Sequence, residues 1–375
     1  MINPSDFYNA LISKGISFFT GVPDSLLKDI CAYISDNAPK NRHIIAANEG
    51  SSIGLAVGNY LASGNPSLVY MQNSGFGNTV NPLLSIADND VYSIPMVLLI
   101  GWRGEPGEKD EPQHIKQGKV SEDLLVAMEI PYQIIDENSD VDTVIDKAME
   151  IAISQKKPYA LLVRNNTFEK YTLLKESKTY FPLNREGAIK LIIDQLNEHD
   201  VVVSTTGKTS REVFEYREEL NQTHEKDFLT VGAMGHSSSI ALGIALEKKD
   251  RTIFCIDGDG SALMHMGSIA INGMQKDITN FKHIIINNGS HDSVGGQPTV
   301  GFDIDFSKIA SASGYTLCDS ASDIDEIKEK LKIMINHKGR ALLEIRVNKG
   351  ARENLGRPTQ TPVENKSLFQ KNLFV

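Results

Sequence analysis

Two short apolar runs that each end in a polar turn constrain the fold of this chain most strongly. Ile253–Asp257 predicts a buried strand, and a Gly-Asp-Gly turn at 258–260 follows it directly. His283–Ile286 predicts the next strand and leads into an asparagine pair at 287–288. Neighbouring parallel strands end at the same rim of a sheet, where ligands of open α/β sheets bind. The pattern therefore predicts an α/β fold with a ligand site at that rim.

The polar groups of these two turns suit a hard cation. Asp259 and Asn288 offer side-chain oxygen atoms, and the backbone carbonyl of Ser290 adds a third. Mg²⁺ prefers such ligands and keeps waters or phosphate oxygens in its remaining octahedral positions. Gly258 and Gly260 allow the backbone to approach a diphosphate closely. The alternative is a pair of ordinary strand-end turns that bind nothing.

Composition narrows the class of protein. At 375 residues with 41% hydrophobic residues, the chain can build two domains with substantial cores. Its net charge of −10 argues against nucleic acid as a partner. No apolar run approaches the length of a membrane span, and residues 1–8 lack a signal segment, so we expect no membrane association. Three widely spaced cysteines, Cys31, Cys255 and Cys318, are typical of core thiols in the cytoplasm.

Apolar runs alternate with amphipathic stretches throughout, as in βα units on a parallel sheet. Predicted strands in the first half are Ser17–Thr20, Ile44–Ala47, Ser67–Gln72, Met96–Ile100 and Ala160–Arg164. Those in the second half are Val201–Ser204, Thr252–Asp257, His283–Asn287 and Leu342–Val347.

The chain divides into two halves of similar size. Asn165–Lys178 is polar and lacks clear periodicity, so we expect the domain connection there, between domains 1–170 and 180–375. A faint repeat supports this division, because the small-residue segments Ser51–Gly58 and Ser238–Ala245 resemble each other. Each precedes a predicted strand that ends in a glycine-containing turn. The alternative is that any two buried α/β helices look alike.

The Gly-Asp-Gly turn, with Asn-Asn at this distance, resembles the cofactor motif of the thiamine diphosphate-dependent decarboxylase and acetolactate synthase superfamily. The resemblance implies two doubly wound parallel-sheet domains, with thiamine diphosphate and Mg²⁺ as cofactors. It makes 1–170 the pyrimidine-binding domain and 180–375 the diphosphate- and Mg-binding domain, without a central third domain. It also implies a homodimer or higher homo-oligomer whose sites lie at the subunit interface.

The resemblance implies a role for Glu49, which follows an apolar strand and begins the first small-residue helix. In the superfamily a glutamate in this setting hydrogen-bonds the aminopyrimidine ring nitrogen and promotes the imino tautomer that removes the thiazolium C2 proton. The cofactor needs such a partner because it is otherwise a poor carbon acid at neutral pH. The alternative is a first-turn glutamate favoured by the helix dipole.

The resemblance also implies which residues hold the cofactor. Met234 would prop the cofactor in its bent conformation, and the Gly232 carbonyl would accept from its 4'-amino group. The alternative for Met234 is a side chain that fills a core. Thr206–Thr209 is not a P-loop, because Val202 stands where that motif needs glycine. The implied cofactor-binding set is Glu49, Gly207, Lys208, Thr209, Gly232, Met234, Gly258, Asp259, Gly260, Ser261 and Asn288, and the metal set is Asp259, Asn288 and Ser290.

Candidate substrate residues lie in the first half. Asp24 is a helix N-cap or, as in related decarboxylases, an acidic group that manages protons. His114 ends the Gly/Pro-rich segment after Met96–Ile100 and is a candidate for proton transfer or carboxylate binding, or a solvated loop histidine. Arg103 and Lys109, together with Lys116, are candidates for binding a strongly charged substrate end, with a solvated face as the alternative for each lysine. A further loop, 290–299, contains Gly295-Gly296 and predicts a lid.

Four segments make the resemblance more specific: GVPDSLL, RGEPGEKDEPQH, TGKTSRE and NNGSHDSVGGQPT. Together they resemble the phosphonopyruvate and sulfopyruvate decarboxylases over nearly the whole chain. Fusion of both domains in one chain favours the phosphonopyruvate reaction, the loss of CO₂ from 3-phosphonopyruvate to give phosphonoacetaldehyde, in phosphonate biosynthesis. The alternatives are a sulfopyruvate decarboxylase, an acetolactate synthase-like carboligase, and a non-catalytic cofactor-binding or regulatory subunit.

Overall fold

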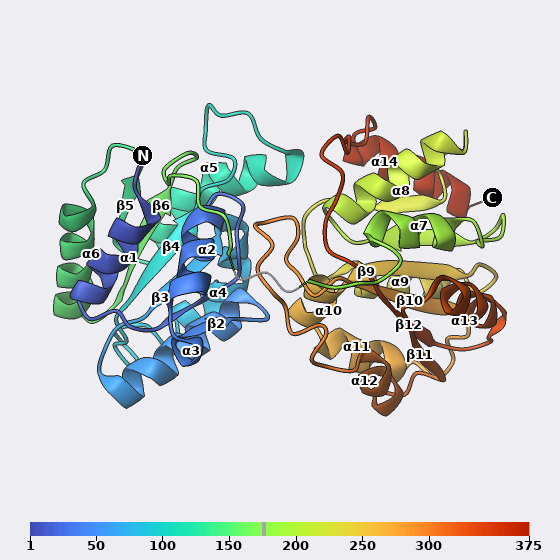
Figure 1. The fold of residues 1–375 in the computed structure, drawn as a ribbon, viewed down its shortest axis with the longest axis horizontal. Helices are drawn as coiled ribbons and strands as arrows, with labels where there is room; N and C mark the ends of the chain where they lie inside the picture. The colour runs from blue at the N-terminus through green and yellow to red at the C-terminus, as the bar shows by residue number, and fades with distance from the viewer. Residues whose placement is uncertain (175–177, 375) are drawn as a thin grey trace. The chain divides into compact units, whose positions relative to one another are not determined.

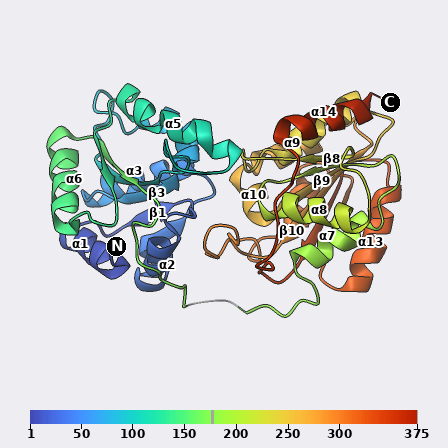
Figure 2. The same ribbon diagram turned by 90° about the horizontal axis from the view of Figure 1, so that it is seen from above.

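The structure, a computed structural model, describes residues 1–174 and 178–374. It divides into two compact units, Met1–Glu176 with Ser293–Gln297, and Ser177–Asp292 with Pro298–Val375. The expected domain connection at 165–178 includes residues 175–177, which lie outside the described residues. Figures 1 and 2 show the course of the chain through each unit in two perpendicular views.

The first unit contains a six-stranded sheet in the order β2-β1-β3-β4-β6-β5, in which every strand pairs in parallel with its neighbours. The strands are β1 (Phe19–Gly21), β2 (His43–Ile45), β3 (Leu68–Gln72), β4 (Met96–Gly101), β5 (Tyr132–Ile135) and β6 (Pro158–Val163). The helices are α1 (Pro4–Ser13), α2 (Lys28–Asn37), α3 (Glu49–Ser63), α4 (Phe76–Leu83), α5 (Pro112–Ala127) and α6 (Val141–Gln155).

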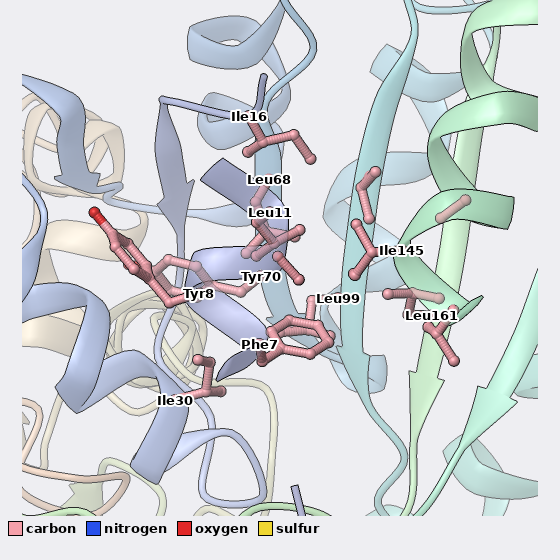
Figure 3. Packing of buried hydrophobic residues seen from close by; sticks show 14 of the residues in the cluster. Phe7, Tyr8, Leu11, Ile16, Ile30, Leu68, Tyr70, Leu99, Ile145 and Leu161 are labelled. Atoms are coloured by element: carbon pink, nitrogen blue, oxygen red, sulfur yellow. The ribbon is translucent and has the colours of Figure 1, made fainter. Parts of the chain in front are cut away.

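Alternate strand residues of this sheet enter two separate cores, as the twofold period of a strand requires. Figure 3 shows one of them, where Phe7 and Leu11 of α1 and Ile145 of α6 meet Leu99 of β4 and Leu161 of β6. The intervening strand residues pack against α3, α4 and α5 on the other face. Helices on both faces bury the sheet and leave its carboxyl-end rim for the polar groups.

The second unit repeats this architecture with the strand order β11-β12-β10-β9-β7-β8, again entirely parallel. The strands are β7 (Val201–Ser204), β8 (Asp227–Leu229), β9 (Ile253–Gly258), β10 (Phe281–Asn287), β11 (Leu317–Ala321) and β12 (Ala341–Arg346). The helices are α7 (Arg185–Ile193), α8 (Lys208–Glu219), α9 (Ser237–Glu247), α10 (Asp259–Met264), α11 (Gly267–Gly273), α12 (Phe306–Ala312), α13 (Ile324–Asn336) and α14 (Pro362–Leu373).

The prediction of two doubly wound parallel sheets is confirmed, and each predicted strand lies within a few residues of an observed one. The strands that the apolar runs did not predict are β5, β8 and β11, each at the edge of its sheet. Edge strands are half-covered and carry more polar residues, so their apolar signal is weaker. Among the described residues, none of the helices combines the length and apolarity of a membrane span.

Candidate active site

Glu49 lies at the first position of α3, where its carboxylate is held in a buried place. The preceding residue, Asn48, caps the helix by accepting a hydrogen bond from the backbone of Ser51 at 2.9 Å. Glu49 is 6% exposed, and its Oε2 accepts from Nδ2 of Asn78 at 2.7 Å. A Cβ added at Gly75 would lie 2.6 Å from Glu49 Cγ, so only glycine fits beside this side chain. A carboxylate buried this tightly keeps one orientation.

Asp24 is not the N-cap of α2, because that helix begins at Lys28 after Leu27. Its side chain is fully buried and accepts from Nε2 of Gln72 at 2.5 Å and from the backbone of Leu26 at 3.0 Å. Burial raises the pKa of the Asp24 carboxyl, although these hydrogen bonds and the charge of Arg103 oppose the shift. Asp24 is therefore a candidate proton carrier.

Arg103 is held by other side chains of the first unit. Asp110 accepts from its Nε at 2.7 Å and also from Nη2, and Ser25 Oγ accepts from Nη1 at 2.7 Å. The guanidinium lowers the pKa of Asp110 well below its usual range, against the effect of burial. The pair is therefore ionised at neutral pH, and the plane of the guanidinium is fixed by its two-point contact.

His114 does not lie in a loop, because α5 begins at Pro112 and places His114 in its first turn. Proline is well suited to that position, since its missing N–H has no partner at a helix start anyway. His114 is 9% exposed, and its buried Nδ1 has no hydrogen-bond partner among the residues that the structure describes. Burial lowers the pKa of His114, with a smaller contribution from Arg103. The ring is thus a neutral donor or acceptor, whereas Lys109 and Lys116 are exposed.

In the second unit, Asp259 begins α10 and is 2% exposed. Its Oδ2 accepts from the hydroxyl of Thr299, and the backbone N–H of Asn288 lies 3.3 Å from Oδ1. No lysine, arginine or histidine in the described part of the chain forms an ion pair with it. Burial raises the pKa of Asp259 to about 6, against these hydrogen bonds. A buried carboxylate without a cationic partner is a natural ligand for a metal ion.

The other expected metal ligands lie beside Asp259 along the rim of the second sheet. Asn288 follows the end of β10, whose neighbour β9 leads directly into Asp259. Asn288 Oδ1 accepts from the backbone of Ser290 at 3.1 Å, and the buried Ser290 Oγ has no hydrogen-bond partner within residues 1–174 and 178–374. Carboxylate, amide and carbonyl oxygens at one rim are the chemistry that Mg²⁺ requires, so these residues fit that ion.

The remaining candidate cofactor residues surround the same rim. Gly207 precedes α8, and Lys208 Nζ donates to the carbonyl of Asp292 at 3.1 Å. The backbone N–H of Gly232 donates to Thr206 Oγ1 at 2.9 Å, while Met234 is half-buried and so retains surface for a ligand.

Ser261 Oγ accepts from Thr205 Oγ1 at 2.9 Å and from Gly235 N at 3.0 Å. Thr209 is buried, and Gly258 and Gly260 flank Asp259.

Several polar residues near these groups were not expected from the sequence. Asn78 and Gln72 contact Glu49 and Asp24 from other elements, and Thr299 contacts Asp259. His291 lies beside the turn, since a Cβ at Gly260 would be 3.3 Å from its ring, and burial lowers the pKa of His291 to about 4. No local motif marks Asn78 or Gln72. His291 and Thr299 lie in the segment 290–299, which was predicted as a lid but not as part of the metal site.

Comparison with known families matches both units. The model described as "Thiamine pyrophosphate enzyme, N-terminal TPP binding domain" matches residues 5–124, and "Thiamine pyrophosphate enzyme, C-terminal TPP binding domain" matches residues 205–345. A phosphonopyruvate decarboxylase of Streptomyces viridochromogenes is 32% identical over 99% of this chain and 94% of its own length. The chain belongs to the thiamine pyrophosphate-dependent decarboxylases. The predicted resemblance is therefore confirmed, and so is the fold of two thiamine diphosphate-binding domains without a central third domain.

Other decarboxylases of this family give a consistent result. A phosphonopyruvate decarboxylase of Streptomyces hygroscopicus is also 32% identical, over 99% of this chain and 94% of its own length. A sulfopyruvate decarboxylase of Methanosarcina acetivorans is 26% identical over 89% of both chains. The protein is a carboxy-lyase, and its reaction class is thiamine diphosphate-dependent decarboxylation of a 2-oxo acid.

Proposed function

We propose that the chain catalyses the non-oxidative, Mg²⁺-dependent decarboxylation of 3-phosphonopyruvate to phosphonoacetaldehyde and CO₂, in phosphonate biosynthesis. The observation that carries this proposal is 32% identity to two phosphonopyruvate decarboxylases over 99% of the chain, against 26% over 89% for a sulfopyruvate decarboxylase. When bound, thiamine diphosphate supplies the electron sink that loss of CO₂ requires.

Glu49 would hold the pyrimidine part of the cofactor, in a pyrimidine-binding domain at 1–170. The hydrogen bond from Asn78 to Oε2 and the close packing against Gly75 fix its carboxylate. The orientation of Oε1 is therefore set before the cofactor binds. Held in this way, the carboxylate would bind the pyrimidine ring nitrogen without reorganisation of the site.

Residues of a diphosphate-binding domain at 180–375 would anchor the other end of the cofactor. Asp259, Asn288 and the carbonyl of Ser290 would hold Mg²⁺, and Gly207, Lys208, Thr209 and Ser261 would contact the diphosphate. Gly232 and Met234 would hold the aminopyrimidine and the bend of the cofactor. The buried, cation-free carboxylate of Asp259 supports this assignment, because ionisation costs less with a metal beside it.

Asp24 and His114 would manage protons on the substrate side. Burial raises the pKa of Asp24, which therefore exchanges a proton more readily near neutral pH than an exposed aspartate does. The neutral ring of His114 has a free buried Nδ1 that can donate to or accept from a reacting oxygen. We assign protonation of the decarboxylated carbon to this pair, without dividing the role between them.

Arg103 would bind the phosphonate. Two of its nitrogens are fixed by Asp110. Nη1 donates to the hydroxyl of Ser25, a neutral partner that a dianion can replace. The exposed Lys109 would add a cation without a fixed geometry.

Product identification tests the proposal. Purified protein is incubated with phosphonopyruvate or sulfopyruvate, with and without thiamine diphosphate and Mg²⁺, and both CO₂ and aldehyde are measured. We expect phosphonoacetaldehyde only when both cofactors are present. A kcat/KM more than tenfold higher for sulfopyruvate would show that sulfopyruvate, and not phosphonopyruvate, is the substrate. Formation of a carbon–carbon coupling product instead of an aldehyde would support a carboligase.

A further inference from the structure

The first asparagine of the pair at 287–288 has no assigned role in the metal site, yet its side chain is the more deeply buried of the two. Asn287 is 0% exposed and Asn288 is 7% exposed. A fully buried amide must find all its hydrogen bonds within the protein, because each one left unmade costs about 1–3 kcal/mol. The partners of Asn287 therefore show what this side chain does.

The amide of Asn287 joins the two ends of the segment 289–301, here named the metal loop. Its Oδ1 accepts from the backbone N–H of Gly289 at 3.0 Å, and its Nδ2 donates to the carbonyl of Gly301 at 2.7 Å. The ends are also linked by Thr299 N–H donating to the Gly289 carbonyl at 3.0 Å. The loop is therefore closed at its base by one side chain that contacts both ends.

Glu344 sets the orientation of that amide. It lies on β12, one strand from β10, and its Oε1 accepts from Asn287 Nδ2 at 2.7 Å. With Glu344 and Gly301 both accepting, the NH₂ group can only point one way, since a flipped amide would place oxygen against oxygen. Glu344 is 0% exposed, and Arg346 Nε supplies its counter-charge at 3.0 Å. Burying this carboxylate costs desolvation free energy, which its hydrogen bonds to Asn287 and Arg346 offset.

The metal loop also contacts Asp259, through Thr299 near its C-terminal end. The backbone N–H of Gly301 donates to Thr299 Oγ1 at 3.1 Å, which leaves the hydroxyl proton of Thr299 to donate to Asp259 Oδ2. A Cβ added at Gly301 would lie 2.7 Å from that same Oδ2. The loop therefore lies against one side of the carboxylate, and the Thr299 hydroxyl occupies a lone pair of Oδ2. Oδ1 accepts the longer 3.3 Å hydrogen bond from the backbone of Asn288 and keeps a second lone pair for a cation.

We infer that Asn287 and Glu344 are positioning residues for the cation, acting through Thr299 on the carboxylate of Asp259. This inference rests on the proposed function of the Asp259 site. Glu344 orients the amide of Asn287, the amide closes the metal loop, and the loop holds Thr299 against Asp259. Groups that orient a metal ligand in this way typically change metal affinity by about 10–100-fold when removed.

The test measures binding of Mn²⁺, in place of Mg²⁺, to the full-length protein with saturating thiamine diphosphate, by electron paramagnetic resonance. Thr299→Val and Glu344→Leu should weaken Mn²⁺ binding about 10-fold or more. Thr299→Ser and Glu344→Gln retain the hydroxyl and the accepting oxygen, so they should restore affinity to within about threefold of wild type. When Thr299→Val and Glu344→Leu are saturated with metal, their kcat should return towards the wild-type value, even though their metal dissociation constants stay raised.

Asp227→Asn is the matched control for general destabilisation. Asp227 is a fully buried carboxylate on the edge strand β8, and it accepts from Arg217 Nε and Nη2 at 3.0 Å each. We expect it to lower the melting temperature without changing Mn²⁺ affinity. Equal Mn²⁺ affinity in wild type, Thr299→Val and Glu344→Leu would overturn the inference and leave the proposed function intact. Failure of the wild type to bind Mn²⁺ and thiamine diphosphate would instead overturn the proposed function.

Discussion

At the scale of single residues, the candidate site depends on carboxylates that the fold buries. Glu49, Asp24 and Asp259 are all at most 6% exposed, and each accepts a hydrogen bond from a side chain on a distant part of the chain. Such burial gives each carboxylate a fixed direction, and it also raises the pKa of Asp24 and of Asp259. A catalytic or metal-binding acid needs properties of this kind.

Replacing Glu49 by glutamine should reduce turnover while preserving the fold. The amide keeps the size of the side chain but is a much weaker partner for a ring that must gain a proton, so kcat should fall by about 10²-fold or more. Melting temperature and Mn²⁺ affinity should stay close to wild type. Turnover at the wild-type rate in this variant would show that Glu49 does not activate the cofactor.

The raised pKa of Asp259 predicts a pH-dependent stability of the cofactor-free protein. Because its pKa is about 6 in the folded state and near 4 when unfolded, the unfolded chain binds fewer protons between these values. The contribution of Asp259 to stability should therefore be fully present below about pH 4, and it should fall by up to about 3 kcal/mol as pH rises through 6. Denaturant unfolding from pH 4 to 7 measures this. The difference in stability between wild type and Asp259→Asn should change across that window, and a constant difference would contradict the assignment.

At the scale of elements, close packing at the end of β4 leaves space only for glycine beside a candidate site residue. At the end of β4, a Cβ added to Gly101 would lie 2.0 Å from Asp24 Oδ2. By contrast, a Cβ at Gly54, inside α3, meets no atom within 4 Å. We therefore expect a glycine-to-alanine substitution to destabilise the protein at Gly101 and to stabilise it at Gly54.

Gly101→Ala should displace Asp24, lowering both stability and turnover, because a fully buried neighbour has no space in which to move. Overpacking of this kind costs about 1–3 kcal/mol. Gly54→Ala, its matched control, should stabilise the protein by about 0.5–1 kcal/mol through helix propensity. Thermal unfolding and steady-state kinetics of both variants check this. Equal stability of the two variants would show that Asp24 does not pack against β4 as described.

Elements also show which parts of the architecture are readable from local pattern. The buried strands β3, β4, β7, β9 and β10 were each predicted from a continuous apolar run, as expected for strands covered on both faces. The unpredicted strands were the short or more polar edge strands, and the start of α5 was hidden within a Gly/Pro-rich segment. Local pattern thus identifies the centre of a sheet better than its edges.

At the scale of the whole molecule, we propose a homodimer or larger homo-oligomer in which Glu49 and Asp259 of one site come from different chains. Glu49→Gln and Asp259→Asn should each be nearly inactive alone. Refolded together in equal amounts, half the dimers would be mixed, and each would contain one site with both wild-type residues. About a quarter of the wild-type activity should return, measured by CO₂ release. No recovery in verified mixed dimers would place both residues of a site in one chain.

The sequence by itself determined the alternation of strands and helices, and it placed Glu49, Asp259 and Asn288 at strand ends. Each of these depends on neighbours within a few residues, because the period of a helix or strand is a local property. Only the tertiary structure decided that Asp110 holds Arg103, that Thr299 contacts Asp259, and that Glu344 orients Asn287. Apart from the first, these pairs join residues about 40 or more positions apart. Such pairs form only when strand order and loop path bring them together, and no periodicity along the chain encodes that choice.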